Sequence, residues 1–278
     1  MAKAARSSAA RTSTTRKGTD VAASYWDASR LPLQVLSLVV PICIAYEVLL
    51  VVGLRAADGA TVTNRAHEGI VRLFRAFGVE GAQVGLPSLS VPAVAVVLVL
   101  LLWQFLSRRP WRIAPLVSLG MACESVLAAL PLYVAGLALS LAIPAMASSS
   151  APVSSAGGVD WAATWGLSLG AGLYEELIFR LALVSLLHAA FHDLVGVKDG
   201  WATWLAVVIA AVAFMLYHPI RSADGTIMIC DAAFLLLAGL WFGGLFVTRG
   251  FGIAVGAHAA YDVLALVAQG AAAAAAHR

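Results

Sequence analysis

The sequence predicts an all-α protein, a polytopic bundle of seven to eight transmembrane helices. Of its 278 residues, 61% are hydrophobic and only 12% are charged, and the mean hydropathy is +0.89. No ordinary soluble domain has this composition. Strict alternation of polar and apolar residues is absent from the apolar runs, so the sequence does not predict a membrane-spanning β-barrel.

Seven apolar runs are long enough to cross a bilayer, which takes about 20 mostly apolar residues in a helix. They cover residues 31–54, 81–107, 114–148, 161–188, 201–218, 230–248 and 251–276. The run at 114–148 would measure about 50 Å as one straight helix at 1.5 Å per residue. Because Pro131, Gly136 and Pro144 interrupt it, it could form two spans and supply the eighth.

The spans and their connections divide the chain into four parts. Residues 1–30 carry six Lys or Arg and two Asp among Ser, Thr and Ala, which predicts a disordered basic tail. Residues 31–146 form an N-terminal scaffold, and within it 67–79 has the spacing of a helix lying flat on the membrane interface. A Ser/Ala/Gly-rich linker at 147–160 leads to a C-terminal bundle at 161–278.

The basic residues predict an orientation and a location. Lys and Arg stay on the cytoplasmic side of a membrane, so the tail places the N-terminus in the cytoplasm, together with SRRPWR at 107–112 and TRG at 248–250. The net charge of +3 comes mostly from the tail and suits an anionic lipid surface rather than nucleic acid. Short loops indicate a compact protein, which we expect in a bacterial inner membrane.

The stretch LYEELIFR, residues 173–180, places three charges inside an apolar run. A carboxylate at bilayer depth costs about 3 kcal/mol, so such a group normally faces a partner or a water-filled cavity. Glu176 and Arg180 are four residues apart and share one helical face, where they can pair. Glu175 points about 100° away from Glu176 and has no partner in its own helix, which makes it a candidate general base.

Two later spans carry polar groups that could meet Glu175. FMLYH, residues 214–218, ends one span with His218, and HAAYD, residues 258–262, puts His258 and Asp262 on one face of the last span. These carboxylates and imidazoles could activate water by general base catalysis or could bind a divalent metal that does so. Taken singly, the Glu–Arg pair could equally be a packing clamp, and a histidine at a span end could be an interfacial residue.

The three motifs resemble those of the CAAX-protease and bacteriocin-processing family (CPBP, or ABI) of intramembrane endopeptidases, which includes the protease that trims prenylated CAAX proteins. That family carries EExxxR, FxxxH and HxxxN or HxxxD on successive helices. Here they read EELIFR at 175–180, FMLYH at 214–218 and HAAYD at 258–262. The resemblance covers about residues 160–270 and implies that the C-terminal bundle is catalytic.

The resemblance also implies a role for each motif residue. Glu175 and His218 would activate the attacking water, and His258 with Asp262 would stabilise the oxyanion of the tetrahedral intermediate. Structural support would come from Glu176, Arg180 and Phe214. The implied activity is hydrolysis of a peptide bond in a membrane-associated or lipidated protein, with that substrate and the lipid bilayer as the expected partners.

Asp262 departs from the asparagine of the best-described family members. An ionised carboxylate repels an oxyanion, so Asp262 should be protonated, orient His258 as an acceptor, or ligate a metal, and we favour the orienting role. Zinc is a possible cofactor, with Glu175, His218 and His258 as ligands, although they do not form a compact HExxH arrangement. The sequence does not decide whether a metal is present.

Alternating straight spans would place His218 and His258 toward opposite membrane faces. They can meet if the helix breaks at Pro219 and the polar segment that follows dips into a cavity lined by protein. The alternative functions are a non-catalytic protein of the same fold, serving bacteriocin self-immunity or as a scaffold, and an ion or proton pathway. A transport pathway would predict paired inverted repeats, and the sequence shows none.

Overall fold

The computed structural model describes residues 25–52, 91–142, 161–222 and 224–276, with positions 69, 72, 76, 154–155 and 158–159. Most of three expected segments therefore lies outside the described residues: the tail at 1–30, the interfacial helix at 67–79 and the linker at 147–160.

Helices make up nearly all of the described chain. They are α2 (Pro32–Val52), α4 (Val91–Ser107), α5 (Pro115–Ala142), α7 (Trp161–Glu176), η2 (Leu177–Val184), α8 (Ser185–Ala189), η3 (Ala190–Leu194), α9 (Asp199–Tyr217), α10 (Ile229–Arg249) and α11 (Phe251–Ala276). Two short strands, β1 (Ser154–Ser155) and β2 (Gly158–Val159), pair antiparallel.

Six of the described helical stretches are long and apolar enough to cross a membrane, and α4 is a shorter apolar helix. Counting α4, they correspond to the seven predicted spans. Pro131 lies inside α5, which continues through it from Pro115 to Ala142, so the described residues contain no eighth span. Large apolar side chains cover the outside of the helices, such as Phe105 and Leu141, which are 70% and 76% exposed. This surface suits lipid, and the chain is an integral membrane protein.

The LYEELIFR stretch lies where the helix changes its winding. From α7 the chain runs without interruption through η2, α8 and η3, and both η2 and η3 are π-helical. The α-helical winding ends at Glu176, so Arg180 lies on the first π-helical turn. Such wide turns are rare and are frequent at functional sites.

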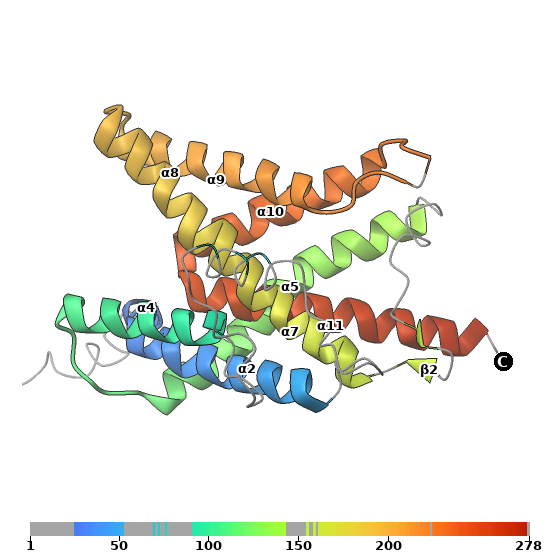
Figure 1. Ribbon diagram of the computed structural model, residues 1–278, viewed down its shortest axis with the longest axis horizontal. Helices are drawn as coiled ribbons and strands as arrows, with labels where there is room; N and C mark the ends of the chain where they lie inside the picture. The colour runs from blue at the N-terminus through green and yellow to red at the C-terminus, as the bar shows by residue number, and fades with distance from the viewer. Residues whose placement is uncertain are drawn as a thin grey trace, which may run out of the picture.

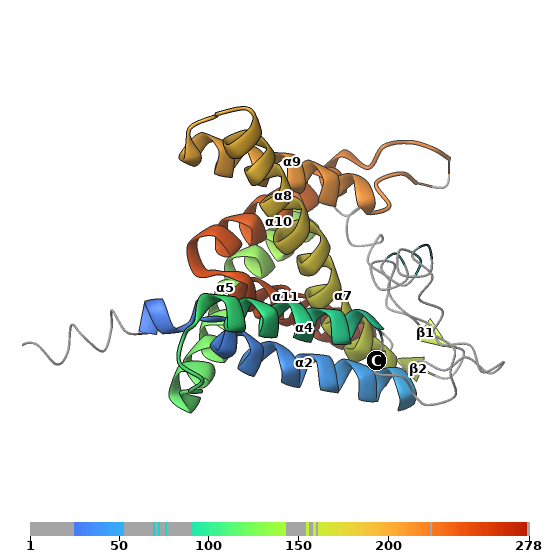
Figure 2. The same ribbon diagram turned by 60° about the vertical axis from the view of Figure 1, so that its left-hand side comes forward.

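The bundle has two parts that meet on α7 and α11. Figures 1 and 2 show α2 and α4 packed side by side, with α5, α7 and α11 crossing the middle and α8, α9 and α10 on the other side. Tyr46 of α2 packs edge to face on Tyr174 of α7, with ring centroids 5.3 Å apart. The most extensive packing is that of α11 on α7 and α5, and that of α9 on α10.

Two glycines allow helix backbones to approach each other closely. A Cβ at Gly172 of α7 would lie 2.6 Å from the backbone nitrogen of Ala259 in α11. At Gly239 of α10, a Cβ would lie 2.9 Å from the Cα of Ala211 in α9. Small residues at these positions bring α7 into close contact with α11, and α9 into close contact with α10.

The chain breaks after α9 at the predicted place, but the described residues of the segment that follows are largely exposed and do not dip into a cavity lined by protein as expected. The helix ends at Tyr217, His218 is extended, and Pro219 follows. The segment from 219 to 228 runs outward beyond the end of α9 before α10 returns (Figure 1). His218 therefore lies before the turning point of the chain, and both it and His258, two turns into α11, lie near Glu175.

Candidate active site

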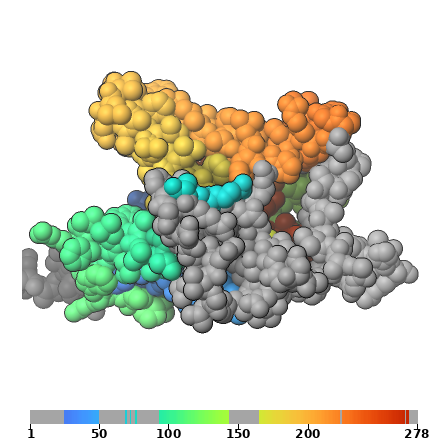
Figure 3. All heavy atoms as spheres, viewed as in Figure 1, coloured from blue at the N-terminus to red at the C-terminus, as the bar shows by residue number. Residues whose placement is uncertain are grey.

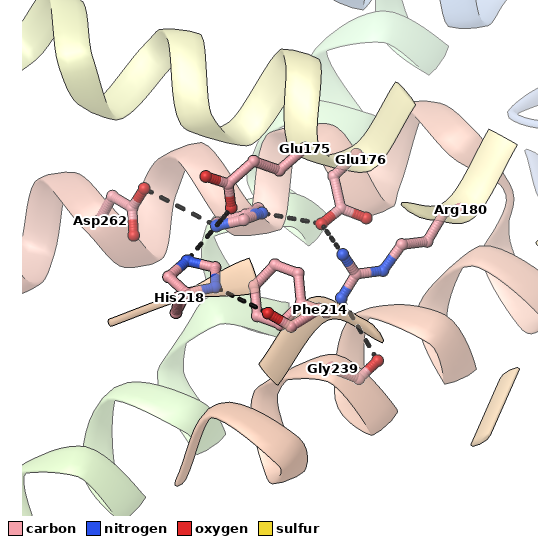
Figure 4. A network of polar contacts seen from close by, with 8 residues as sticks. Glu175, Glu176, Arg180, Phe214, His218, Gly239 and Asp262 are labelled. Atoms are coloured by element: carbon pink, nitrogen blue, oxygen red, sulfur yellow. Dashed lines mark hydrogen bonds and ion pairs between the residues drawn. The ribbon is translucent and has the colours of Figure 1, made fainter. Parts of the chain in front are cut away.

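Glu176 joins two of the three motifs. Its Oε1 lies 3.1 Å from Nη1 of Arg180 and accepts a hydrogen bond of 2.7 Å from Nδ1 of His258 (Figure 4). All three side chains are buried. Arg180 also donates to the carbonyl of Gly239 at 3.3 Å, and its guanidinium carbon lies 4.5 Å from the ring centroid of Phe214. The predicted helical pair is present, and it also holds a histidine of another helix.

Glu175 lies on the other side of the same crossing. Its Oε2 is 3.6 Å from Nε2 of His218 and 3.9 Å from Nε2 of His258. The residue is only 6% exposed. Among the described residues, this oxygen has no partner at hydrogen-bond distance. Two imidazoles thus face one buried carboxylate oxygen from just beyond direct bonding distance.

The backbone of α9 orients His218. Its Nδ1 lies 2.8 Å from the carbonyl oxygen of Phe214, and because a carbonyl only accepts, Nδ1 is the donor. In the neutral ring, Nε2 is then the acceptor that faces Glu175. The Phe214 ring packs against His218, with centroids 4.5 Å apart.

Side chains of two other helices hold His258. Phe242 of α10 stacks on its ring with centroids 4.5 Å apart and an angle of 15° between the planes. With Nδ1 bound to Glu176, the Nε2 atom faces both Glu175 and Asp262, and Oδ2 of Asp262 is 3.7 Å away. The contact that orients this ring therefore comes from Glu176, since the Asp262 distance exceeds that of a hydrogen bond.

The cluster is closed on one side and open on the other. The side chains of Glu176 and Arg180 are 0% and 2% exposed, whereas those of His218 and Asp262 are 24% and 23% exposed. A molecule could therefore reach Glu175 past His218 and Asp262, while the ion pair lies behind it (Figure 4).

A second, partly buried ion pair was not predicted from the sequence. Glu124 of α5 pairs with Arg249 at the end of α10, and the hydroxyl of Tyr25 donates to the same carboxylate. Arg249 also lies over the ring of Trp26, 3.5 Å from its centroid. Glu124 and Arg249 are 125 residues apart in the sequence. No local sequence pattern therefore indicates that they pair, and only the fold shows it.

The side-chain cluster does not form a recognisable metal site. Within the part of the chain that the structure describes, no three His, Cys, Asp or Glu side chains gather as a group that could hold a metal ion. In the set predicted as zinc ligands, Oε2 of Glu175 lies 3.6 Å from Nε2 of His218 and 3.9 Å from Nε2 of His258.

One comparison with known proteins finds a family similar to the C-terminal bundle. Residues 157–264 match the family model Rce1-like, described as type II CAAX prenyl endopeptidase Rce1-like. No curated protein and no solved structure matches the chain. The matched residues contain all three motifs and every side chain of the cluster, which confirms the resemblance predicted from those motifs. Residues 157–264 of this integral membrane protein are thus similar to the CAAX-protease family of Rce1-like endopeptidases.

Proposed function

We propose that the protein is an intramembrane endopeptidase that hydrolyses a peptide bond with a water molecule held by Glu175 and His218. The observation that carries this proposal is the buried Oε2 of Glu175, which the two Nε2 atoms face at 3.6 and 3.9 Å. A buried polar atom normally has a partner, and a water bound here could bond to the carboxylate and to His218 together.

The two side chains have complementary roles toward that water. Glu175 accepts a proton as the water oxygen attacks the carbonyl carbon, and it later returns the proton to the leaving amine nitrogen. His218 accepts the second hydrogen bond of the water through Nε2, because Nδ1 is occupied by the Phe214 carbonyl. The low polarity around a residue that is 6% exposed strengthens both contacts.

His258 is suited to stabilise the oxyanion of the tetrahedral intermediate. When its Nε2 carries a proton, that atom can donate to a developing negative charge, while Glu176 holds the ring through Nδ1. Asp262, beside Nε2, would serve this role as a neutral acid or by bonding to the protonated ring. No step of the mechanism uses a metal. Zinc binding remains a prediction. Measuring the proteolytic activity before and after dialysis against a chelator would test it.

The substrate class follows from the site's surroundings. The cluster lies among helices with lipid-facing outer surfaces, and its open side runs past His218 and Asp262. A protein segment anchored in the same bilayer could bring its peptide bond there without crossing bulk water. The family match favours a CAAX-like, lipidated C-terminus over other membrane-associated proteins.

Protein termini in membranes of the source cell would test this function. Cells carrying wild-type protein are compared with cells carrying Glu175→Gln, which removes the base and keeps the side-chain shape. New termini that depend on wild type would name both the substrate and the cleaved bond. Identical termini at equal protein abundance would contradict the proposal. They would favour one of the non-catalytic functions, namely bacteriocin self-immunity, a scaffold or an ion pathway.

A further inference from the structure

A pocket of about 470 Å³ lies between α4, η2, α8 and the junction of α10 with α11. This volume is within the range of small-ligand sites, roughly 300 to 1,000 Å³. None of the candidate catalytic side chains lines it. Its walls are mostly apolar and include Val99, Trp103, Leu181 and Phe246.

The pocket opens on the lipid-facing side of the bundle. Val99 and Trp103 are 47% and 43% exposed, and α8 on the opposite wall exposes Leu186 to 68%. Figures 1 and 3 show α4 and α8 on either side of this region. Apolar walls that face a bilayer are expected to be covered by hydrocarbon rather than by water.

A cation marks one end of the pocket. Arg30 lines it, is exposed, and donates from Nη2 to the carbonyl of Thr248. A guanidinium has five N–H donors, so that contact leaves donors for a ligand. Arg108 and Arg109 lie just beyond the end of α4, five and six residues after Trp103, and are also exposed. This end of the bundle is therefore basic, and the tryptophan beside it is typical of the membrane interface.

We propose that this pocket binds an anionic phospholipid of the adjacent leaflet. One acyl chain lies along Trp103, Leu181 and Phe246, and the phosphate bonds to the guanidinium of Arg30. Guanidinium groups bind phosphate through paired, charge-assisted hydrogen bonds. Ser185 lines the same pocket and is exposed, so a larger side chain at this position would occupy the space of the lipid.

Lipid retention by the purified full-length protein tests this proposal independently of any protease activity. The protein is equilibrated in mixed micelles with equal amounts of phosphatidylglycerol and phosphatidylcholine, and the lipids that remain bound are counted by native mass spectrometry. Wild type is expected to retain phosphatidylglycerol preferentially. Arg30→Gln should lower its affinity about fivefold, the effect of one basic residue at an anionic surface.

Two further variants separate binding in the pocket from a general effect of surface charge. Ser185→Phe fills the pocket, leaves Arg30 in place and should also lower retention. Arg112→Gln removes an exposed cation that does not line the pocket and should retain lipid as wild type does. Equal retention of the two lipids by wild type, or a loss in Arg112→Gln as large as in Arg30→Gln, would overturn the proposal. Unchanged retention in Ser185→Phe would show that the lipid binds elsewhere.

Discussion

The Nδ1 atom of His258 lies 2.7 Å from Oε1 of Glu176, the second glutamate of the EELIFR motif. The first, Glu175, faces Nε2 of the same ring at 3.9 Å. Adjacent residues of a helix point about 100° apart, so one pair of glutamates can reach both sides of one imidazole. Glu176 holds the ring and Arg180 together, and Glu175 is left facing the open side of the site.

Glu176→Gln should destabilise the protein. The change leaves the buried guanidinium of Arg180 without its carboxylate, and breaking a buried pair on one side costs about 3 to 5 kcal/mol. Thermal unfolding in detergent would measure the loss. The double variant Glu176→Gln with Arg180→Met should recover most of the stability, because it removes the unpaired charge. Equal unfolding temperatures for wild type and Glu176→Gln would contradict this account of the ion pair.

Gly172→Ala should separate the helices that form the site. The new methyl group would lie 2.6 Å from the Ala259 nitrogen, so α7 and α11 must move apart, at a cost of about 1 to 3 kcal/mol. Proteolysis should fall as well, since Glu175 and His258 lie within one turn of this contact. Gly244→Ala is the matched control, because its Cβ would meet nothing within 4 Å. Equal losses in both variants would show that the crossing is not critical.

Asp262→Asn should keep the activity. Asparagine has the same shape, carries no charge and can donate a hydrogen bond toward an oxyanion. Asp262→Ala should lower kcat by about 10²-fold, the effect of removing one oxyanion donor. Initial rates at saturating substrate would compare the two variants. A loss in Asp262→Asn equal to that in Asp262→Ala would instead mean that the negative charge itself is required.

Tyr25 should make the protein sensitive to alkali. Burial, and then the hydrogen bond to Glu124, raise the pKa of Tyr25 from 10.0 to about 12. The folded state thus holds the phenolic proton more tightly than the unfolded state. This stabilisation is complete below pH 10 and is lost as the pH rises toward 12. Between those values the unfolding temperature of wild type should fall more than that of Tyr25→Phe. Parallel curves for the two proteins would contradict this role for Tyr25.

Spacing along the chain predicts the contacts that lie within one helix. The Glu176–Arg180 pair is visible in the sequence because residues four apart share a helical face, and the structure contains it at 3.1 Å. The break before Pro219 was also predictable, because proline cannot continue the hydrogen bonding of a helix. Membrane spans follow from length and hydropathy alone.

Contacts between different helices were harder to predict from the sequence. The sequence assigned the orienting of His258 to Asp262, on the same helix, whereas the ring bonds to Glu176 and stacks on Phe242. That arrangement depends on how closely α7 and α11 cross, which the Gly172 contact permits. Glu124 and Arg249 pair for the same reason, through the packing of helices far apart in the chain.

The central claim is that Glu175 is the general base of a protease. The most direct measurement is cleavage of a lipidated CAAX-type peptide by purified, reconstituted wild type and Glu175→Gln. Asp199→Asn serves as the matched control, since it neutralises an exposed carboxylate far from the cluster. Loss of the base should lower kcat by at least about 10²-fold, with an unchanged unfolding temperature and normal activity in Asp199→Asn. Cleavage by Glu175→Gln at the wild-type rate would contradict the account.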